Sequence, residues 1–188
     1  STIKAQFALG VNSPSSSGFV NEFEANSINF PSINFPSINL GVQYMFKKQL
    51  GGKLDFGFNR AVSADGSLDF KLNYTRINAQ IVYNFTDVIG FLPESMLIML
   101  HAGPGMSITK PLANYSENKY TFLNGLIGME IHYRLSRKLS ILGDMGYAKS
   151  FSGKNKYDTA LEGFSFNGDL VYGTIGISVA LSGCRYCN

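Results

Sequence analysis

The feature of this 188-residue sequence that most restricts its fold is a strict alternation of apolar with small or polar residues. Between Val171 and Leu181 every second residue is Val, Ile, Leu or Gly, and the residues between them are Tyr, Thr, Gly, Ser and Ala. The segment from Leu123 to Leu135 repeats the pattern, with charged residues on its polar face. Because successive side chains of a β-strand point to opposite faces, this period predicts an all-β chain.

The predicted strands are long. They lie near 2–12, 37–46, 53–62, 75–85, 97–109, 122–135, 139–151 and 168–181. Strands of globular sandwiches usually have about five or six residues, whereas a tilted strand that crosses a bilayer needs roughly nine to eleven. No window approaches the roughly 18 apolar residues of a spanning helix. The sequence therefore predicts a single closed antiparallel up-and-down transmembrane β-barrel of about eight strands.

The predicted connections alternate in length. The segments 47–52 and 136–138 are tight, whereas 13–36, 110–121 and 152–167 are long and polar, as in barrels with short periplasmic turns and long outer loops. The segment 86–96 is a longer turn. The segment 63–74 keeps an alternation of its own, which predicts a hairpin that extends beyond the membrane with a parity change near Arg76. Pro104 lies inside a predicted strand and cannot donate to its ladder, so we expect a β-bulge there.

Charge placement indicates which face points outward. Only 15% of the residues are charged, against roughly 25% in an ordinary soluble domain, so we expect part of the surface to meet something other than water. On the apolar faces, charges occur only at strand ends on the loop side: Arg60, Lys149 and Asp169. On the opposite faces they occur in mid-strand or near tight turns, where lipid contact would be very unfavourable. We therefore expect the apolar faces to contact lipid, with an aromatic girdle near the tight turns formed by Tyr44, Phe46, Tyr83, Phe85 and Tyr133.

The interior of such a barrel is just wide enough for side chains to fill, which argues against diffusive transport. A hairpin closed at 136–138 makes Glu130 and Asp144 inward cross-strand neighbours, and two such carboxylates need a cation. We predict a buried network of lumen charges that fills the barrel, with neither a metal nor a cofactor. Its candidate members are Glu130, Asp144, Arg134, Lys4, Lys53 and Asp55.

The chain is a succession of alternating strands that end in aromatic residues, as in Ile38 to Phe46 and Ile77 to Phe85. In this it resembles the OmpA-like eight-stranded outer-membrane β-barrel family of Gram-negative bacteria. The resemblance covers nearly the whole chain. It implies a location in the cell outer membrane and a role in tethering, adhesion or as an accessory subunit of a larger assembly. It also implies contact with the lipid bilayer and with other outer-membrane or periplasmic proteins, and seldom catalysis. A following domain that binds peptidoglycan is common in the family. We expect the barrel in 1–182 and a periplasmic stub in 183–188, and peptidoglycan contact only through a domain not present here.

Two short motifs remain. The repeat in 29–38 places Phe30, Ile33 and Phe35 in the first long loop, which suggests partner contact or an ambiguity of strand register. Cys184 and Cys187 suggest a local disulfide or a linker, with a redox motif or half of a zinc site as alternatives.

The remaining function classes can be weighed from charge and from the histidines. A scattered net charge of +3 argues against nucleic acid. His101 and His132 both fall on the inner face, where they fill the lumen and do not catalyse. We therefore expect no catalytic residues and a structural or binding role. The alternatives are a soluble lipocalin-like carrier of an apolar ligand, which requires the reversed orientation, and a lipid-modifying enzyme, which requires a histidine beside Ser or a carboxylate in an accessible groove.

Overall fold

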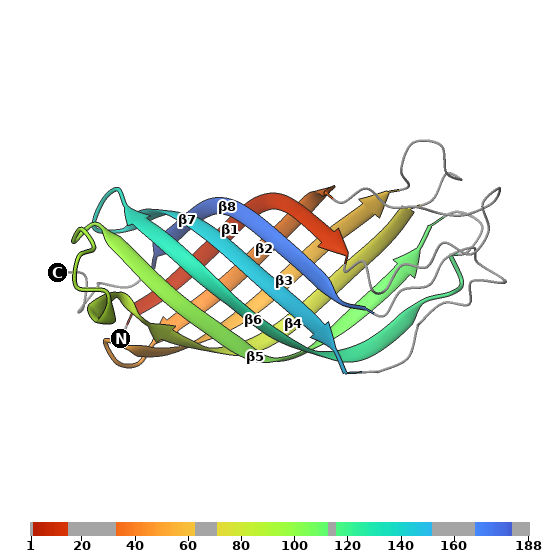
Figure 1. Cartoon of the computed structure of the whole chain (residues 1–188), viewed down its shortest axis with the longest axis horizontal. Helices are drawn as coiled ribbons and strands as arrows, with labels where there is room; N and C mark the ends of the chain where they lie inside the picture. The colour runs from red at the N-terminus through yellow and green to blue at the C-terminus, as the bar shows by residue number, and fades with distance from the viewer. Residues whose placement is uncertain (1, 15–32, 63–70, 113–115, 152–167, 182–188) are drawn as a thin grey trace.

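A computed structural model describes residues 2–14, 33–62, 71–112, 116–151 and 168–181 and shows a closed antiparallel barrel (Figure 1). Each strand pairs with the next along the chain, and the last pairs with the first. The eight strands are β1 (Thr2–Pro14), β2 (Asn34–Met45), β3 (Leu50–Val62), β4 (Lys71–Asn84), β5 (Met96–Pro111), β6 (Tyr120–Arg134), β7 (Leu139–Ser150) and β8 (Leu170–Ala180). The predicted barrel is confirmed.

The two ends of the barrel differ. The β2–β3 and β6–β7 connections are tight, and the β4–β5 connection holds the short 3-10 helix η2 (Thr86–Val88). These three connections define what we call the turn end, at which β1 begins and β8 finishes (Figure 1). The other four connections leave from the opposite end, which we call the loop end. Among the described residues no helix is long and apolar enough to cross a membrane.

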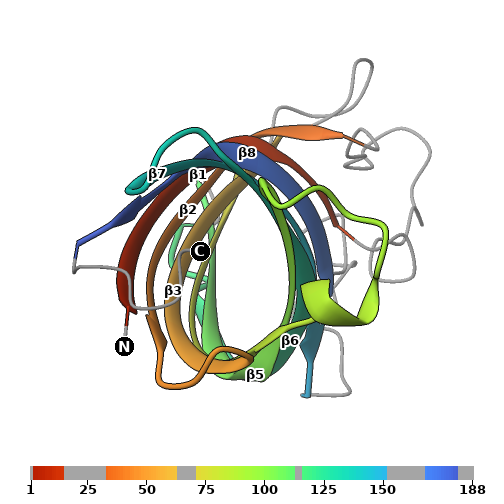
Figure 2. The ribbon, with the colours of Figure 1, turned by 90° about the vertical axis from the view of Figure 1, so that its left-hand side faces the viewer.

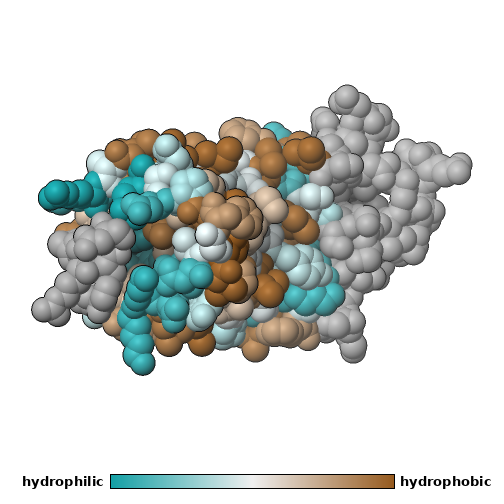
Figure 3. Space-filling view, turned by 60° about the vertical axis from the view of Figure 1, so that its left-hand side comes forward, coloured by the Kyte–Doolittle hydropathy of each residue, from teal (hydrophilic) through white to brown (hydrophobic). Residues whose placement is uncertain are grey.

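The barrel is apolar outside and polar inside, as the alternation predicts. Ile127 and Ile175 are 63% and 72% exposed on the outer surface, whereas Glu130 is fully buried in the lumen. On the face seen in Figure 3, hydrophobic side chains gather along the middle of the barrel and hydrophilic ones toward the turn end. Four of the five predicted girdle aromatics, Tyr44, Phe46, Tyr83 and Tyr133, are exposed, and Phe85 is half-buried. This orientation excludes the soluble apolar-ligand carrier, which needs the reverse.

The lumen is filled in three layers along the barrel axis. An apolar cluster occupies the loop end and contains Ala61, Leu72, Tyr74, Phe122, Leu126, Ala148, Leu170 and Tyr172. A smaller one near the turn end contains Met45, Val82 and Met99, with Leu97 packed against it. Charged and amide side chains occupy the level between these clusters. Side chains of these types fill an eight-stranded interior, which is too narrow to leave a water channel.

Two local predictions were wrong. Leu72, Tyr74, Arg76 and Asn78 all point inward, so β4 has no parity change at Arg76. The reason is that the lumen itself is apolar at the loop end. Apolar residues of β4 therefore point inward there, on the same face of the strand as the polar residues that point into the middle of the lumen.

Pro104 introduces no bulge. The β4–β5 and β5–β6 registers are continuous across it, and the β4–β5 ladder lacks only the two pairs that would join Ala79 and Gln80 to β5. Proline has no N–H, so Pro104 cannot donate a hydrogen bond to β4 at this point of the ladder. The register irregularity lies instead in β1, between Gly10 and Asn12.

Candidate functional site: a buried ion-pair network in the lumen

The polar layer of the lumen is centred on two carboxylates from neighbouring strands. Glu130 of β6 and Asp144 of β7 face each other directly in the β6–β7 register, and both are buried. Lys53 reaches them from β3, on the far side of the barrel. Its Nζ contacts Glu130 Oε1 directly and lies 3.7 Å from Asp144 Oδ2. The ammonium group therefore supplies the cation that the carboxylate pair requires.

A second ion pair lies beside the first. Arg76 of β4 contacts Asp55 of β3 directly, and its Nη2 donates to Asn39 Oδ1 at 2.9 Å. The guanidinium carbon lies 4.3 Å from the centroid of the Tyr172 ring, a distance at which a cation is attracted to the ring face. Asp55 Oδ1 lies 3.8 Å from Lys53 Nζ, so the two ion pairs form one network.

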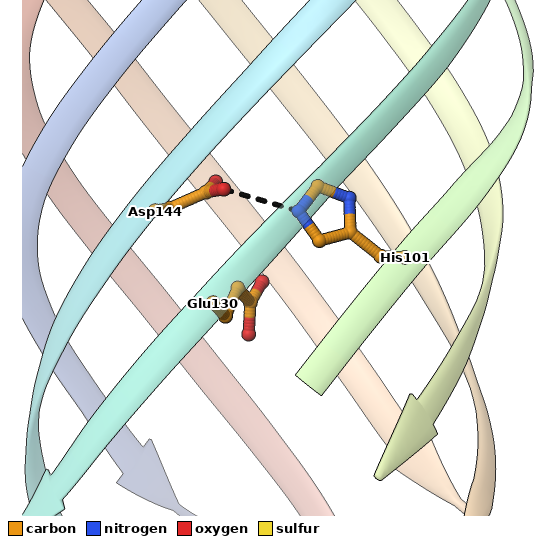
Figure 4. A group of neighbouring side chains, drawn as sticks. All are labelled: His101, Glu130 and Asp144. Atoms are coloured by element: carbon orange, nitrogen blue, oxygen red, sulfur yellow. Dashed lines mark hydrogen bonds and ion pairs between the residues drawn. The ribbon is translucent and has the colours of Figure 1, made fainter. Parts of the chain in front are cut away.

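Two histidines complete the network. His101 Nε2 lies 3.1 Å from Asp144 Oδ1, and His132 Nε2 lies 2.7 Å from Glu130 Oε2. Figure 4 shows His101 and Asp144 pointing toward each other beside Glu130. Three carboxylates thus lie against Lys53 and Arg76, and each imidazole contacts one of these carboxylates through Nε2.

The donor set of His101, Glu130 and Asp144 deserves comparison with a metal site, because its three potential ligand atoms lie within 4.8 Å of one another. In type, these ligands suit a divalent cation. The position beside them is taken by the Lys53 ammonium group, which contacts one carboxylate and approaches the other. The geometry therefore fits an internal cation better than a bound metal.

Amide and hydroxyl groups connect this network to both neighbouring layers. Gln6 Nε2 donates to Gln43 Oε1 at 3.0 Å and to Glu130 Oε2 at 3.1 Å, and Tyr172 OH donates to Asp144 Oδ2 at 3.3 Å. A chain of hydrogen bonds also runs toward the loop end through Asn78, Asn124, Ser107 and Tyr74. Burial of this many polar groups is tolerated because they bond to one another.

The predicted site residues are divided between the network and the barrel ends. Lys53, Asp55, Glu130 and Asp144 come together, whereas Lys4 and Arg134 line the mouth at the turn end. Arg134 Nη2 donates there to the backbone oxygen of Glu94 at 3.1 Å. Their assignment to the central network is corrected: both side chains point inward, but their strand positions lie too near the turn end to reach Glu130 or Asp144 at ion-pair distance.

The other predicted residues lie away from the lumen. Ile33 and Phe35 are 66% and 65% exposed, near the loop end. Phe30, Cys184 and Cys187 lie outside the described residues, as does the predicted stub in 183–188.

Arg76 is the network residue that the sequence prediction missed. The sequence contained the information needed to place it, because Arg76 stands two positions from Asn78 and four from Gln80, and both of these side chains point inward. A strand of constant parity would have placed it in the lumen.

The network has the contacts of an enzyme site without its access. Each histidine lies within hydrogen-bond distance of a carboxylate, which is one condition for general acid–base catalysis. Both imidazoles, however, are buried within the barrel, at 2% and 1% exposure, and neither opens into a groove on the outer surface. These side chains fill the polar layer of the lumen.

Comparison with known proteins identifies the fold. No family model matches the sequence, and no curated protein matches it significantly. Among solved structures, Neisserial surface protein A is 15% identical, with a TM-score of 0.58 and coverage of 95% of each chain. The outer-membrane protein OprG of Pseudomonas aeruginosa is 13% identical, with a TM-score of 0.61 and coverage of 96% of this chain and 95% of that one. The N-terminal barrel domain of OprF from the same organism is 9% identical, with a TM-score of 0.54 and coverage of 95% and 97%. At these identities the likeness establishes the fold, which is that of the eight-stranded outer-membrane β-barrels.

Proposed function

We propose that this chain is a non-catalytic barrel of the Gram-negative outer membrane that acts as a structural and binding component, most simply an accessory subunit of a larger envelope assembly. A barrel anchor for a periplasmic peptidoglycan-binding domain is the form that this role takes if more chain follows. Outer-membrane barrels have their short connections on the periplasmic side, which supports a periplasmic turn end here. Since β8 runs toward that end, any following segment would leave the barrel there.

The observation that carries the proposal is the filled lumen. Lys53, Arg76, Glu130 and Asp144 are at most 4% exposed, and apolar clusters close the barrel above and below them. A lumen packed in this way does not conduct solutes. The surfaces through which the protein can act are therefore its lipid-facing wall and its two ends.

Ile33 and Phe35 offer one such surface near the loop end. Both are apolar and about two-thirds exposed. They suit contact with a neighbouring protein or with the outer part of the bilayer.

Native extraction tests this proposal. Membranes are separated by density, the chain is extracted in a mild non-ionic detergent, and the proteins that co-purify are identified. We expect the chain in the outer-membrane fraction together with at least one stoichiometric partner. Phe35→Ser should reduce partner recovery, while Phe151→Ser, a matched phenylalanine with the same 65% exposure, should not. Recovery of the chain alone after chemical cross-linking in intact cells would refute the assembly role.

A further inference from the structure

The turn end of the barrel forms a strongly basic mouth. Its lining includes six cationic side chains, which we call the basic cup: Lys4, Lys47, Lys48, Arg134, Arg137 and Lys138. Lys4 and Arg134 belong to strands of the wall, while the other four belong to the β2–β3 and β6–β7 turns. These two turns lie on opposite sides of the mouth (Figure 2). The cations therefore surround the opening.

Acidic residues do not balance this charge. In sequence, the turn-end connections contain only two, Asp87 and Glu94, and Asp87 pairs with Lys48 at 3.1 Å. Within the described part of the chain, no carboxylate lies within ion-pair distance of Lys4, although its side chain points into the barrel. The four loop-end connections have the opposite bias in sequence, with more acidic than basic residues. The excess positive charge is thus a property of the turn end.

The size of the cup limits what it can hold. Its cavity measures about 60 Å³, whereas pockets for small-molecule ligands usually measure roughly 300–1,000 Å³. A space of this size has room for one carboxylate beside Lys4. All six cations line this small space, four of them from the turns at its rim, so the ligand that contacts all six is an extended chain with several negative groups.

The direction of the opening selects among extended anions. The cup lies at the turn-end mouth, which faces along the barrel axis (Figure 2). In a membrane barrel, lipid headgroups would instead surround the outer wall. A segment that approaches from the water phase can enter the cup end-on. We propose that the basic cup binds an Asp/Glu-rich segment of a partner protein. This inference rests on the proposed function, since it names the chemistry by which the turn end contacts another subunit.

Peptide binding to the folded barrel tests the inference. The full chain is folded into nanodiscs of zwitterionic phosphatidylcholine, and binding of a fluorescein-labelled ten-residue Glu-Gly repeat is followed by anisotropy. The matched neutral probe is the Gln-Gly repeat. We expect saturable binding of the Glu peptide only, which weakens as salt rises because the rim charges are exposed.

Two double variants locate the binding. Lys4→Gln with Arg134→Gln should weaken Glu-peptide binding by about tenfold or more, because it removes the two cup cations that belong to strands of the wall. Lys71→Gln with Lys110→Gln removes two exposed lysines near the loop end and should change binding by less than about twofold. Heat-dependent gel mobility verifies that each variant is folded, and Arg137→Gln with Lys138→Gln on the outer rim gives a second reading if the first pair does not fold.

Three results would overturn the inference: no binding, an equal loss in the cup and loop-end variants, or displacement of the peptide when phosphatidylglycerol replaces part of the nanodisc lipid. The last would assign the cup to lipid. These outcomes are separable from a failure of the proposed function. A barrel that binds the peptide through the cup but is recovered from cells without a partner contradicts the assembly role alone.

Discussion

Replacement of Lys53 by methionine tests the lumen network directly. Methionine keeps the length of the side chain and removes its charge. In the natural chain, Lys53 Nζ lies within 3.8 Å of a carboxylate oxygen of Glu130, Asp144 and Asp55. The variant removes this cation. Removal of one partner of a buried ion pair usually costs about 3–5 kcal/mol, because the remaining charge stays buried without compensation.

The structure places the expected loss near the lower end of that range. Asp55 keeps its contact with Arg76, Glu130 keeps His132, and Asp144 keeps the Nε2 of His101 at 3.1 Å. Each carboxylate thus retains at least one partner. We expect Lys53→Met to lower the free energy of unfolding by about 3 kcal/mol at pH 8.

The deficit should shrink as the pH falls. Without lysine, the folded carboxylates gain from binding a proton, so the folded variant holds more protons than the unfolded one. Stability relative to the natural chain therefore rises toward acidic pH. For the same reason, Glu130→Gln should partly rescue Lys53→Met, since it removes one of the uncompensated charges.

Urea unfolding in phospholipid vesicles measures these effects. Because the chain contains no tryptophan, folding is followed by far-UV circular dichroism and by gel mobility of unheated samples. Lys110→Met serves as the control, because this lysine is exposed near the loop end and should change stability by less than about 0.5 kcal/mol. A loss below about 1 kcal/mol for Lys53→Met, with no dependence on pH, would refute the idea that the ammonium group holds the carboxylates together.

Three further predictions test other parts of the barrel. Ile175→Lys on the outer face should destabilise the barrel by about 2–4 kcal/mol in vesicles if it lies near the bilayer centre, and a negligible effect in urea titrations would contradict the lipid-facing assignment. Tyr172→Phe removes the hydrogen bond to Asp144 but keeps the ring beneath Arg76, so the same titration should show a loss of only about 1 kcal/mol. The natural chain should give no steady conductance in a planar lipid bilayer, because its lumen is filled. A stable open channel would contradict that packing.

Much of the barrel is predictable because its defining property is local. Alternation assigns each residue to one of two faces without knowledge of any distant contact, and strand length and loop length then indicate a membrane barrel. The cross-strand pairing of Glu130 with Asp144 also follows locally, from a tight turn and a regular register. Such features depend only on neighbours along the chain or across one hairpin.

The errors arose where local patterns have two physical origins. Near Arg76, apolar residues in the alternation suggested a change of face, but the loop end of the lumen is itself apolar, so the face stayed the same. At Pro104 a missing N–H suggested a bulge. The neighbouring Gly103 instead lets β4 approach so closely that an added β-carbon would clash with the carbonyl oxygen of Ala79, and the ladder loses two pairs without a change of register.

The partners across the lumen were not predictable for a different reason. Lys53 and Glu130 stand on β3 and β6, which do not pair in the sheet, so no register relates them. Their contact depends on the height of each side chain along the barrel axis, which is set by the accumulated stagger of all the strands between them. Lys4 and Arg134 share the inward face of Lys53 and differ from it in height. Inward parity therefore selects the candidates for the central network. Axial height decides that Lys53 contacts its carboxylates while Lys4 and Arg134 remain at the mouth of the barrel.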